Sequence, residues 1–155
     1  MRLDQDSLGA VSIPDNALYS SNSVRGAENF HLIGQPISAY PNFVKAMAKV
    51  KKIAAIANFS VDAMDANIAD AIVRACDEII NGQHHENFIV ALAEGSGGTF
   101  TNMNFNEVIA NRAGEILGDP LGSYLRINPL ARYSYPARGL FLADAKNPIH
   151  QTAFN

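Results

Sequence analysis

The chain has 155 residues, a formal net charge of −3 and a single cysteine. This length fits one ordinary domain with a core of its own, and the slight acidity disfavours nucleic acid or an anionic membrane as the main partner. The lone Cys76 leaves no partner for an intrachain disulfide. Together with a polar, acidic N-terminus and no apolar run of membrane-spanning length, it predicts a cytoplasmic location with no signal peptide.

The first 40 residues are rich in turn formers and show no sustained hydrophobic period. The glycine, proline and asparagine residues that interrupt them include Gly9, Pro14, Asn16, Asn22, Gly26, Gly34 and Pro36. We therefore expect an irregular N-terminal arm that contains a short strand or turn.

A first helix is predicted over 41–58, because Pro41 suits a first helical turn and an apolar stripe follows it. The stripe consists of Phe43, Val44, Met47, Val50, Ala54 and Ala57. Lysines occupy the other side of the helix, at Lys45, Lys49, Lys51 and Lys52. A charged helix face is usually solvated, and we prefer that interpretation to an anion-binding surface.

A second helix is predicted over 65–81, where Ile68, Ile72, Cys76 and Ile79 share one face and Gly82 follows the end. Cys76 lies on the apolar stripe, which favours a buried structural thiol over a nucleophile. His84 and His85 come next, in a polar loop. No third ligand stands at a suitable interval, so the sequence predicts no metal site there.

Three glycines within four residues (Gly95, Gly97 and Gly98) precede a third predicted helix over 102–117, with Thr101 or Asn102 as its N-cap. Backbone N–H groups and the helix dipole would then converge on one point, which attracts a carboxylate or phosphate. A tight loop before a well-capped helix is the structural alternative. The stretch is not a P-loop, because no lysine follows the last glycine.

The helix start also carries a run of asparagines, an odd choice because asparagine is a poor helix-interior residue. Residues 98–111 read Gly-Thr-Phe-Thr-Asn-Met-Asn-Phe-Asn-Glu-Val-Ile-Ala-Asn. This run resembles the signature Gly-Thr-x-x-Asn-Met-Asn-x-Asn-Glu-Val-x-Ala-Asn of the aspartase/fumarase family of lyases.

Further motifs support the resemblance in order along the chain. Asp-Ser-Leu-Gly at 6–9, Ile-Pro at 13–14 and Arg-Gly-Ala-Glu-Asn-Phe at 25–30 are similar to the opening of the aspartases. Val-Lys-Lys at 50–52 and Asn-Pro at 128–129 favour aspartase over fumarase. The resemblance implies a mainly α fold, the N-terminal helical domain of the L-aspartase-like fold with its irregular arm.

After residue 129 the agreement ends, so we expect an aspartase-like N-terminal domain at 1–129 and a divergent C-terminal tail at 130–155. The family's Ser-Asn-Asp segment does not appear in the tail, and the mobile loop that carries the family's serine base is also absent. The sequence therefore predicts no catalytic residue in this chain. A frameshifted or truncated gene end and a genuine short paralogue both fit this pattern.

The resemblance implies an N-terminal domain or fragment of an aspartate ammonia-lyase, which converts L-aspartate to fumarate and ammonia, and which is inactive alone. The substrate-binding residues that it implies are Gly98, Thr99, Thr101, Asn102 and Asn104, with no cofactor and no metal. Glu94 would repel an anion from this site, since the family has a neutral residue there. The alternatives are a non-catalytic module that docks onto a full-length lyase homologue and a fragment of a fumarase-like hydratase. The expected partners are a small dicarboxylate, bound weakly, and either a second copy of the chain or a full-length lyase.

Overall fold

Helices make up most of the regular structure in the computed structural model, which describes residues 1–31, 34–129 and 143–144. Helix α1 spans Ser21–Asn29, α2 spans Pro41–Ser60, α3 spans Ala66–Ile80 and α4 spans Thr99–Ile116. The last three correspond to the helices predicted over 41–58, 65–81 and 102–117, although α4 begins at Thr99, before the predicted start. The expected mainly α class is confirmed.

The N-terminal arm is more regular than its turn-rich sequence indicates. Strands β1 (Arg2–Asp6) and β2 (Gly9–Ile13) form an antiparallel hairpin in which Arg2 pairs with Ile13 and Asp6 with Gly9. The hairpin is fastened to α1 by an ion pair between Arg25 and Asp6, whose atoms lie 2.6 Å apart. Such short elements depend on contacts outside themselves, and this explains why hydrophobic period alone did not predict them.

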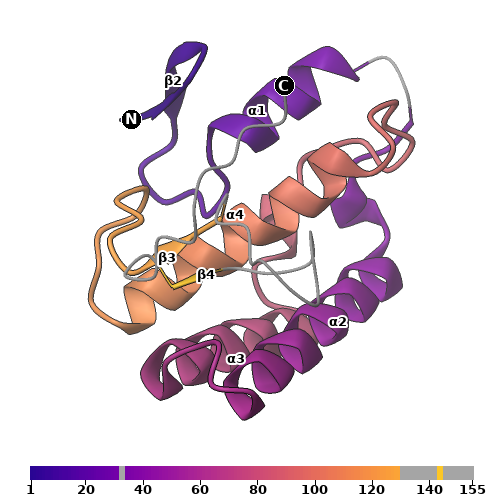
Figure 1. The fold of residues 1–155 in the computed structure, drawn as a ribbon. Helices are drawn as coiled ribbons and strands as arrows, with labels where there is room; N and C mark the ends of the chain where they lie inside the picture. The colour runs from indigo at the N-terminus through magenta and orange to yellow at the C-terminus, as the bar shows by residue number, and fades with distance from the viewer. Residues whose placement is uncertain (32–33, 130–142, 145–155) are drawn as a thin grey trace, which may run out of the picture.

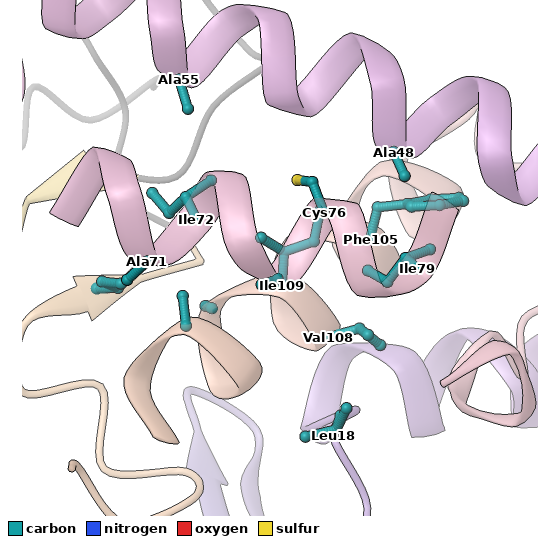
Figure 2. Close-up of a cluster of buried hydrophobic side chains, with 14 of the residues drawn as sticks. Leu18, Ala48, Ala55, Ala71, Ile72, Cys76, Ile79, Phe105, Val108 and Ile109 are labelled. Atoms are coloured by element: carbon teal, nitrogen blue, oxygen red, sulfur yellow. The ribbon is translucent and has the colours of Figure 1, made fainter. Parts of the chain in front are cut away.

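Helix α4 lies at the centre of the fold, with α1 on one side of it and α2 and α3 on the other (Figure 1). Side chains of α3 fill the space between α2 and α4, as Figure 2 shows for Ile72, Cys76 and Ile79. The predicted apolar stripe of this helix is fully buried. The Cys76 thiol is 0% exposed, as predicted, and burial raises its pKa to about 12.

Helix α2 is turned about its axis relative to the predicted orientation. Val50 and Ala57, assigned to the buried stripe, are exposed, whereas Lys51, assigned to the solvated lysine face, is only 2% exposed. The residues that α2 buries are Val44, Ala48, Lys51, Ala54, Ala55 and Asn58. The interpretation of a fully solvated lysine face was therefore wrong at Lys51, because a polar surface on α4 faces that position.

Short segments connect the helices. The 3-10 turns η1 (Ile37–Ala39) and η2 (His85–Asn87) flank two extended stretches that run antiparallel, with a bridge between Pro36 and Ala91. Strand β3 (Ile127–Asn128) pairs with β4 (Ala143–Asp144). Within the described ranges, no helix is long and apolar enough to cross a bilayer.

The Glu107 carboxylate of α4 joins this helix to the N-terminus of α1. It is 1% exposed and accepts hydrogen bonds from the backbone N–H groups of Ser20, Asn22 and Ser23 at 2.9–3.0 Å. The Asn22 amide and the Ser23 hydroxyl donate two more. The first turn of α1 has no side-chain cap of its own. Glu107 therefore caps α1 from another helix, where its charge also suits the positive end of the helix dipole.

Replacing Glu107 with Gln should destabilise the fold. One acceptor oxygen becomes an NH₂ group that faces buried N–H donors, which should cost about 3 kcal/mol. Urea unfolding monitored by circular dichroism would measure the loss. The matched control is Glu115→Gln, which neutralises a solvent-exposed carboxylate on the same helix and should change stability by less than about 0.5 kcal/mol. Equal stabilities for the two variants would contradict the capping role.

Candidate functional site

The glycine-rich loop delivers the chain into α4 through two left-handed residues. Gly97 has φ 68° and Gly98 has φ 89°, a region that residues with a Cβ rarely adopt. A Cβ at either position would meet nothing within 4 Å, so the backbone conformation, and not crowding, is what requires glycine here. The helix begins at Thr99 with Gly98 as its N-cap, so the predicted cap at Thr101 or Asn102 was wrong by about one turn.

Upstream side chains bind the first N–H groups of α4. The Glu94 carboxylate accepts from the backbone N–H of Thr101 at 3.1 Å and from that of Ser96 at 2.8 Å. The Ser96 hydroxyl donates to Glu94 and accepts from the N–H of Phe100 at 3.1 Å. Burial disfavours the Glu94 anion, but these hydrogen bonds from Ser96 and Thr101 outweigh it and lower its pKa. An anion of the chain itself therefore holds part of the helix start.

The five predicted substrate-binding residues are not equally accessible. Gly98 and Thr99 are exposed at the loop, and the Thr99 hydroxyl donates to the carbonyl oxygen of Ser96 at 3.1 Å. Thr101 and Asn102 are half-buried in the first turn of α4. Asn104 is 0% exposed and lies in the core. The structure brings the first four together at the helix start and sets Asn104 apart from them.

Asn104 has a clear structural task. Its amide donates to the carbonyl oxygen of Asn87 at 3.0 Å and accepts from the N–H of Val90 at 3.3 Å. Asn111 lies about two helical turns further on. It similarly donates to the Leu18 carbonyl and accepts from the N–H of Gly122. These amides satisfy backbone groups in segments that have no regular ladder. Asn104 and Asn111 thus tie loops to α4.

Lys51 is the polar residue that the sequence interpretation missed. Its ammonium donates to the side-chain oxygens of Asn102 at 2.6 Å and Asn106 at 2.8 Å. Burial lowers the pKa of Lys51 to about 8. The signal available in the sequence was its spacing: Lys51 falls seven residues after Val44 and seven before Asn58, both of which are buried on one side of α2.

The start of α4 has donors that suit an anion at the surface, but the nearby Glu94 carboxylate repels such an anion. The backbone N–H groups of Gly97, Gly98 and Thr99 donate to no group within the described part of the chain. They lie beside the Thr99 hydroxyl at the positive end of an 18-residue helix. Glu94 carries a like charge at the same place and weakens attraction of a second anion.

The two histidines after α3 and one surface cleft are not part of the glycine loop. His84 bonds to Glu78 at 2.8 Å, and His85 bonds to the Ile79 carbonyl oxygen at 2.8 Å, so both extend the end of α3. Both are half-buried in the loop where the sequence placed them. One cleft, of about 650 Å³, lies between β2 and α1 and is lined by Ser12, Tyr19 and Ala27 among others, with no residue of the glycine loop in its lining.

Comparison with known proteins gives consistent results. The model of a family described as lyase matches residues 9–147. The aspartate ammonia-lyase of Helicobacter pylori strain J99 is 41% identical over 129 residues, which are 83% of this chain and 28% of that protein. The aspartate ammonia-lyase of Pseudomonas aeruginosa is 39% identical over 152 residues, or 98% of this chain and 31% of the relative. A fumarate lyase:delta crystallin structure from Brucella melitensis superposes with a TM-score of 0.80 at 46% identity, covering 83% of this chain and 29% of that one.

The chain thus spans less than a third of the length of the relatives it matches. The alignments with the two relatives cover 129 and 152 residues, and most of the predicted tail lies outside the described residues. The division of the chain at residue 129 therefore stays a prediction.

Proposed function

Because this chain belongs to the lyase family that includes aspartate ammonia-lyases and fumarate lyases, we propose that it supplies the N-terminal part of an aspartate ammonia-lyase. In this proposal residues 1–129 are the family's N-terminal domain and 130–155 a tail that has diverged. The observation that carries the proposal is the glycine loop, which opens the first turn of α4 to the surface within a chain about 40% identical to aspartate ammonia-lyases.

The proposed ligand is a small dicarboxylate, one carboxylate of which would lie over residues 97–99. The free N–H groups there and the Thr99 hydroxyl are donors of the kind that carboxylates accept from, and Thr101 and Asn102 extend the set into the first helical turn. Asn104 supports this site from the core by fixing the segment around Val90. With one partial set of donors and no bidentate arginine among the described residues at this site, affinity should be on the order of millimolar, about −4 kcal/mol.

In this proposal the chain supplies part of the substrate-binding site but not the base for the elimination. Eliminating ammonia from aspartate needs a base that removes a weakly acidic C–H proton, in addition to stabilising the resulting anion. Glu94, the carboxylate at the loop, is a poor base, because three hydrogen bonds stabilise its ionised form. We infer that the remaining groups come from segments or subunits beyond this chain.

The first prediction of the proposed function concerns activity. The purified 155-residue chain should form no fumarate from aspartate and no malate from fumarate, because Glu94 is a poor base and the proposal takes the base from outside this chain. Ultraviolet absorbance of fumarate measures both reactions. The aspartate ammonia-lyase of Helicobacter pylori is the positive control. Turnover above the blank would contradict the proposal that the chain is inactive alone.

The second prediction concerns binding. In a succinate titration followed by amide chemical shifts, residues 97–102 should respond. Thr99→Val removes one hydroxyl at constant shape and should cost roughly 1 kcal/mol of binding, about fivefold in Kd. Glu94→Gln should strengthen binding, because it removes a like charge from beside the ligand.

The matched controls for this titration are Ser60→Ala, which deletes an exposed hydroxyl at the end of α2, and Glu28→Gln, which makes the same charge change at an exposed position on α1. Both should bind succinate as the unaltered chain does. Shifts that cluster around Lys45 and Lys49 in place of the loop would show that the loop is structural and the site assignment wrong.

A non-catalytic docking module is the second candidate function, and the surface of α2 favours it. Large apolar side chains stand at 41–65% exposure along this helix and just after it: Val50, Ile53, Ile56, Phe59 and Val61. We name these five residues the α2 patch. Contiguous apolar surface of this kind commonly marks an interface, here with a second copy of the chain or a full-length lyase.

The third prediction follows from the α2 patch. The chain should self-associate in light scattering and bind a hydrophobic dye, and Ile53→Lys should weaken both effects. Ala46→Lys adds the same charge to an exposed position of α2 outside the patch and should leave both unchanged. A monomeric chain that binds no dye would count against the docking function.

A further inference from the structure

A buried ammonium group lies directly beneath the start of α4. Lys51 is 2% exposed, whereas its neighbour Lys52 reaches the surface and pairs with Asp77 at 2.6 Å. Burying a lysine is costly, and the lowered pKa of Lys51 reflects that cost. An apolar residue would pack against α3 and α4 without the penalty. A charged group retained at such a position calls for an explanation beyond packing.

Hydrogen bonds from Lys51 determine the orientation of two amides. An ammonium group can only donate, so the atom of Asn102 at 2.6 Å and that of Asn106 at 2.8 Å must be the carbonyl oxygens. The NH₂ group of each side chain then points away from Lys51. That of Asn106 donates inward to the carbonyl oxygen of Pro129 at 3.1 Å.

The NH₂ group of Asn102 differs from that of Asn106 in having an open direction. Within the described residues, this NH₂ group has no acceptor. It nevertheless reaches solvent, because the Asn58 amide is the only fully buried side-chain polar group without a partner in this part of the chain. Asn102 stands three residues after Thr99, so the two side chains are neighbours on the surface of α4. The Asn102 amide and the exposed Thr99 hydroxyl therefore belong to the same first turn of α4.

We propose that Lys51 is a positioning residue: it holds the Asn102 amide with its NH₂ group outward, as a donor to a carboxylate oxygen of the ligand at the glycine loop. This rests on the proposed dicarboxylate site and adds a specificity element to it. Without the ammonium, the Asn102 amide could turn its oxygen outward, and that orientation repels a carboxylate. The positive charge of Lys51 behind Asn102 also offsets part of the repulsion between Glu94 and an anionic ligand.

The test uses the complete 155-residue chain, succinate as the probe and two variants. Lys51→Met keeps an unbranched side chain that is one atom shorter and removes the donors. Asn102→Asp keeps an acceptor for Lys51, with which it forms an ion pair that should maintain the fold, but it replaces the outward donor with an anion. The matched control is Lys52→Met, which removes one charge from the adjacent residue and leaves Asn102 untouched. Side-chain NH₂ signals of asparagine report the orientation directly.

In the unaltered chain, succinate should shift the NH₂ signals of Asn102 and leave those of Asn106 in place. Lys51→Met should weaken succinate binding about tenfold and bring the free Asn102 signals close to those of a solvent-exposed amide. Asn102→Asp should weaken binding at least as much while it unfolds at the same denaturant concentration. Lys52→Met should bind within about twofold of the unaltered chain.

The outcomes separate this proposal from the one on which it rests. Absence of any succinate response in the unaltered chain overturns the dicarboxylate site, and the ligand role of Asn102 with it. Normal binding by the unaltered chain and by a folded Lys51→Met variant overturns only the role of Lys51. If Lys51→Met does not fold, wild-type affinity in Asn102→Asp overturns the proposal by itself, because the outward donor would then be dispensable.

Discussion

The fold depends on one buried carboxylate. Glu107 is on the central helix and accepts five hydrogen bonds from the segment that begins α1. Those donors include backbone N–H groups that no residue of α1 caps, so without Glu107 they would be buried and unpaired. The same contact decides where the N-terminal arm lies, because α1 in turn carries the ion pair between Arg25 and Asp6 of the hairpin.

The other polar side chains of α4 apply the same principle to the remaining irregular segments. Asn104 bonds to the chain around residues 87–90, Asn106 bonds to Pro129, and Asn111 bonds to Leu18 and Gly122. A helix that buries asparagine and glutamate instead of leucine gives up some apolar contact, and in return it satisfies backbone groups that loops cannot pair among themselves. The polar character that makes α4 unusual as a helix is thus what makes it suitable as the centre of this fold.

The candidate site arises from the same architecture. It lies at the start of α4, where some N–H donors have no partner in the described residues. At the start of α4, Glu94 and Ser96 hold two of the first N–H groups, while those of residues 97–99 and the NH₂ group of Asn102 donate to no group in the described part of the chain. The chain is under a third as long as its relatives, and the carboxylate at this loop, Glu94, has a lowered pKa that does not suit proton removal. Donors come with the helix start, whereas a base must be brought by another element.

The sequence by itself determined the elements with a strong local signal. The stripe of Ile68, Ile72, Cys76 and Ile79 predicted α3 and its buried thiol, and Gly97 and Gly98 predicted the sharp entry to α4, since only local sterics are involved. The motif over residues 98–111 also identified the family. Only the tertiary structure decided the roles of the polar residues. Burial of Lys51, the bond from buried Asn104 to the Asn87 carbonyl and capping of α1 by Glu107 all join segments separated along the chain. A periodic pattern records which face of a helix is apolar, but it carries no information on which distant backbone group a buried polar side chain will satisfy.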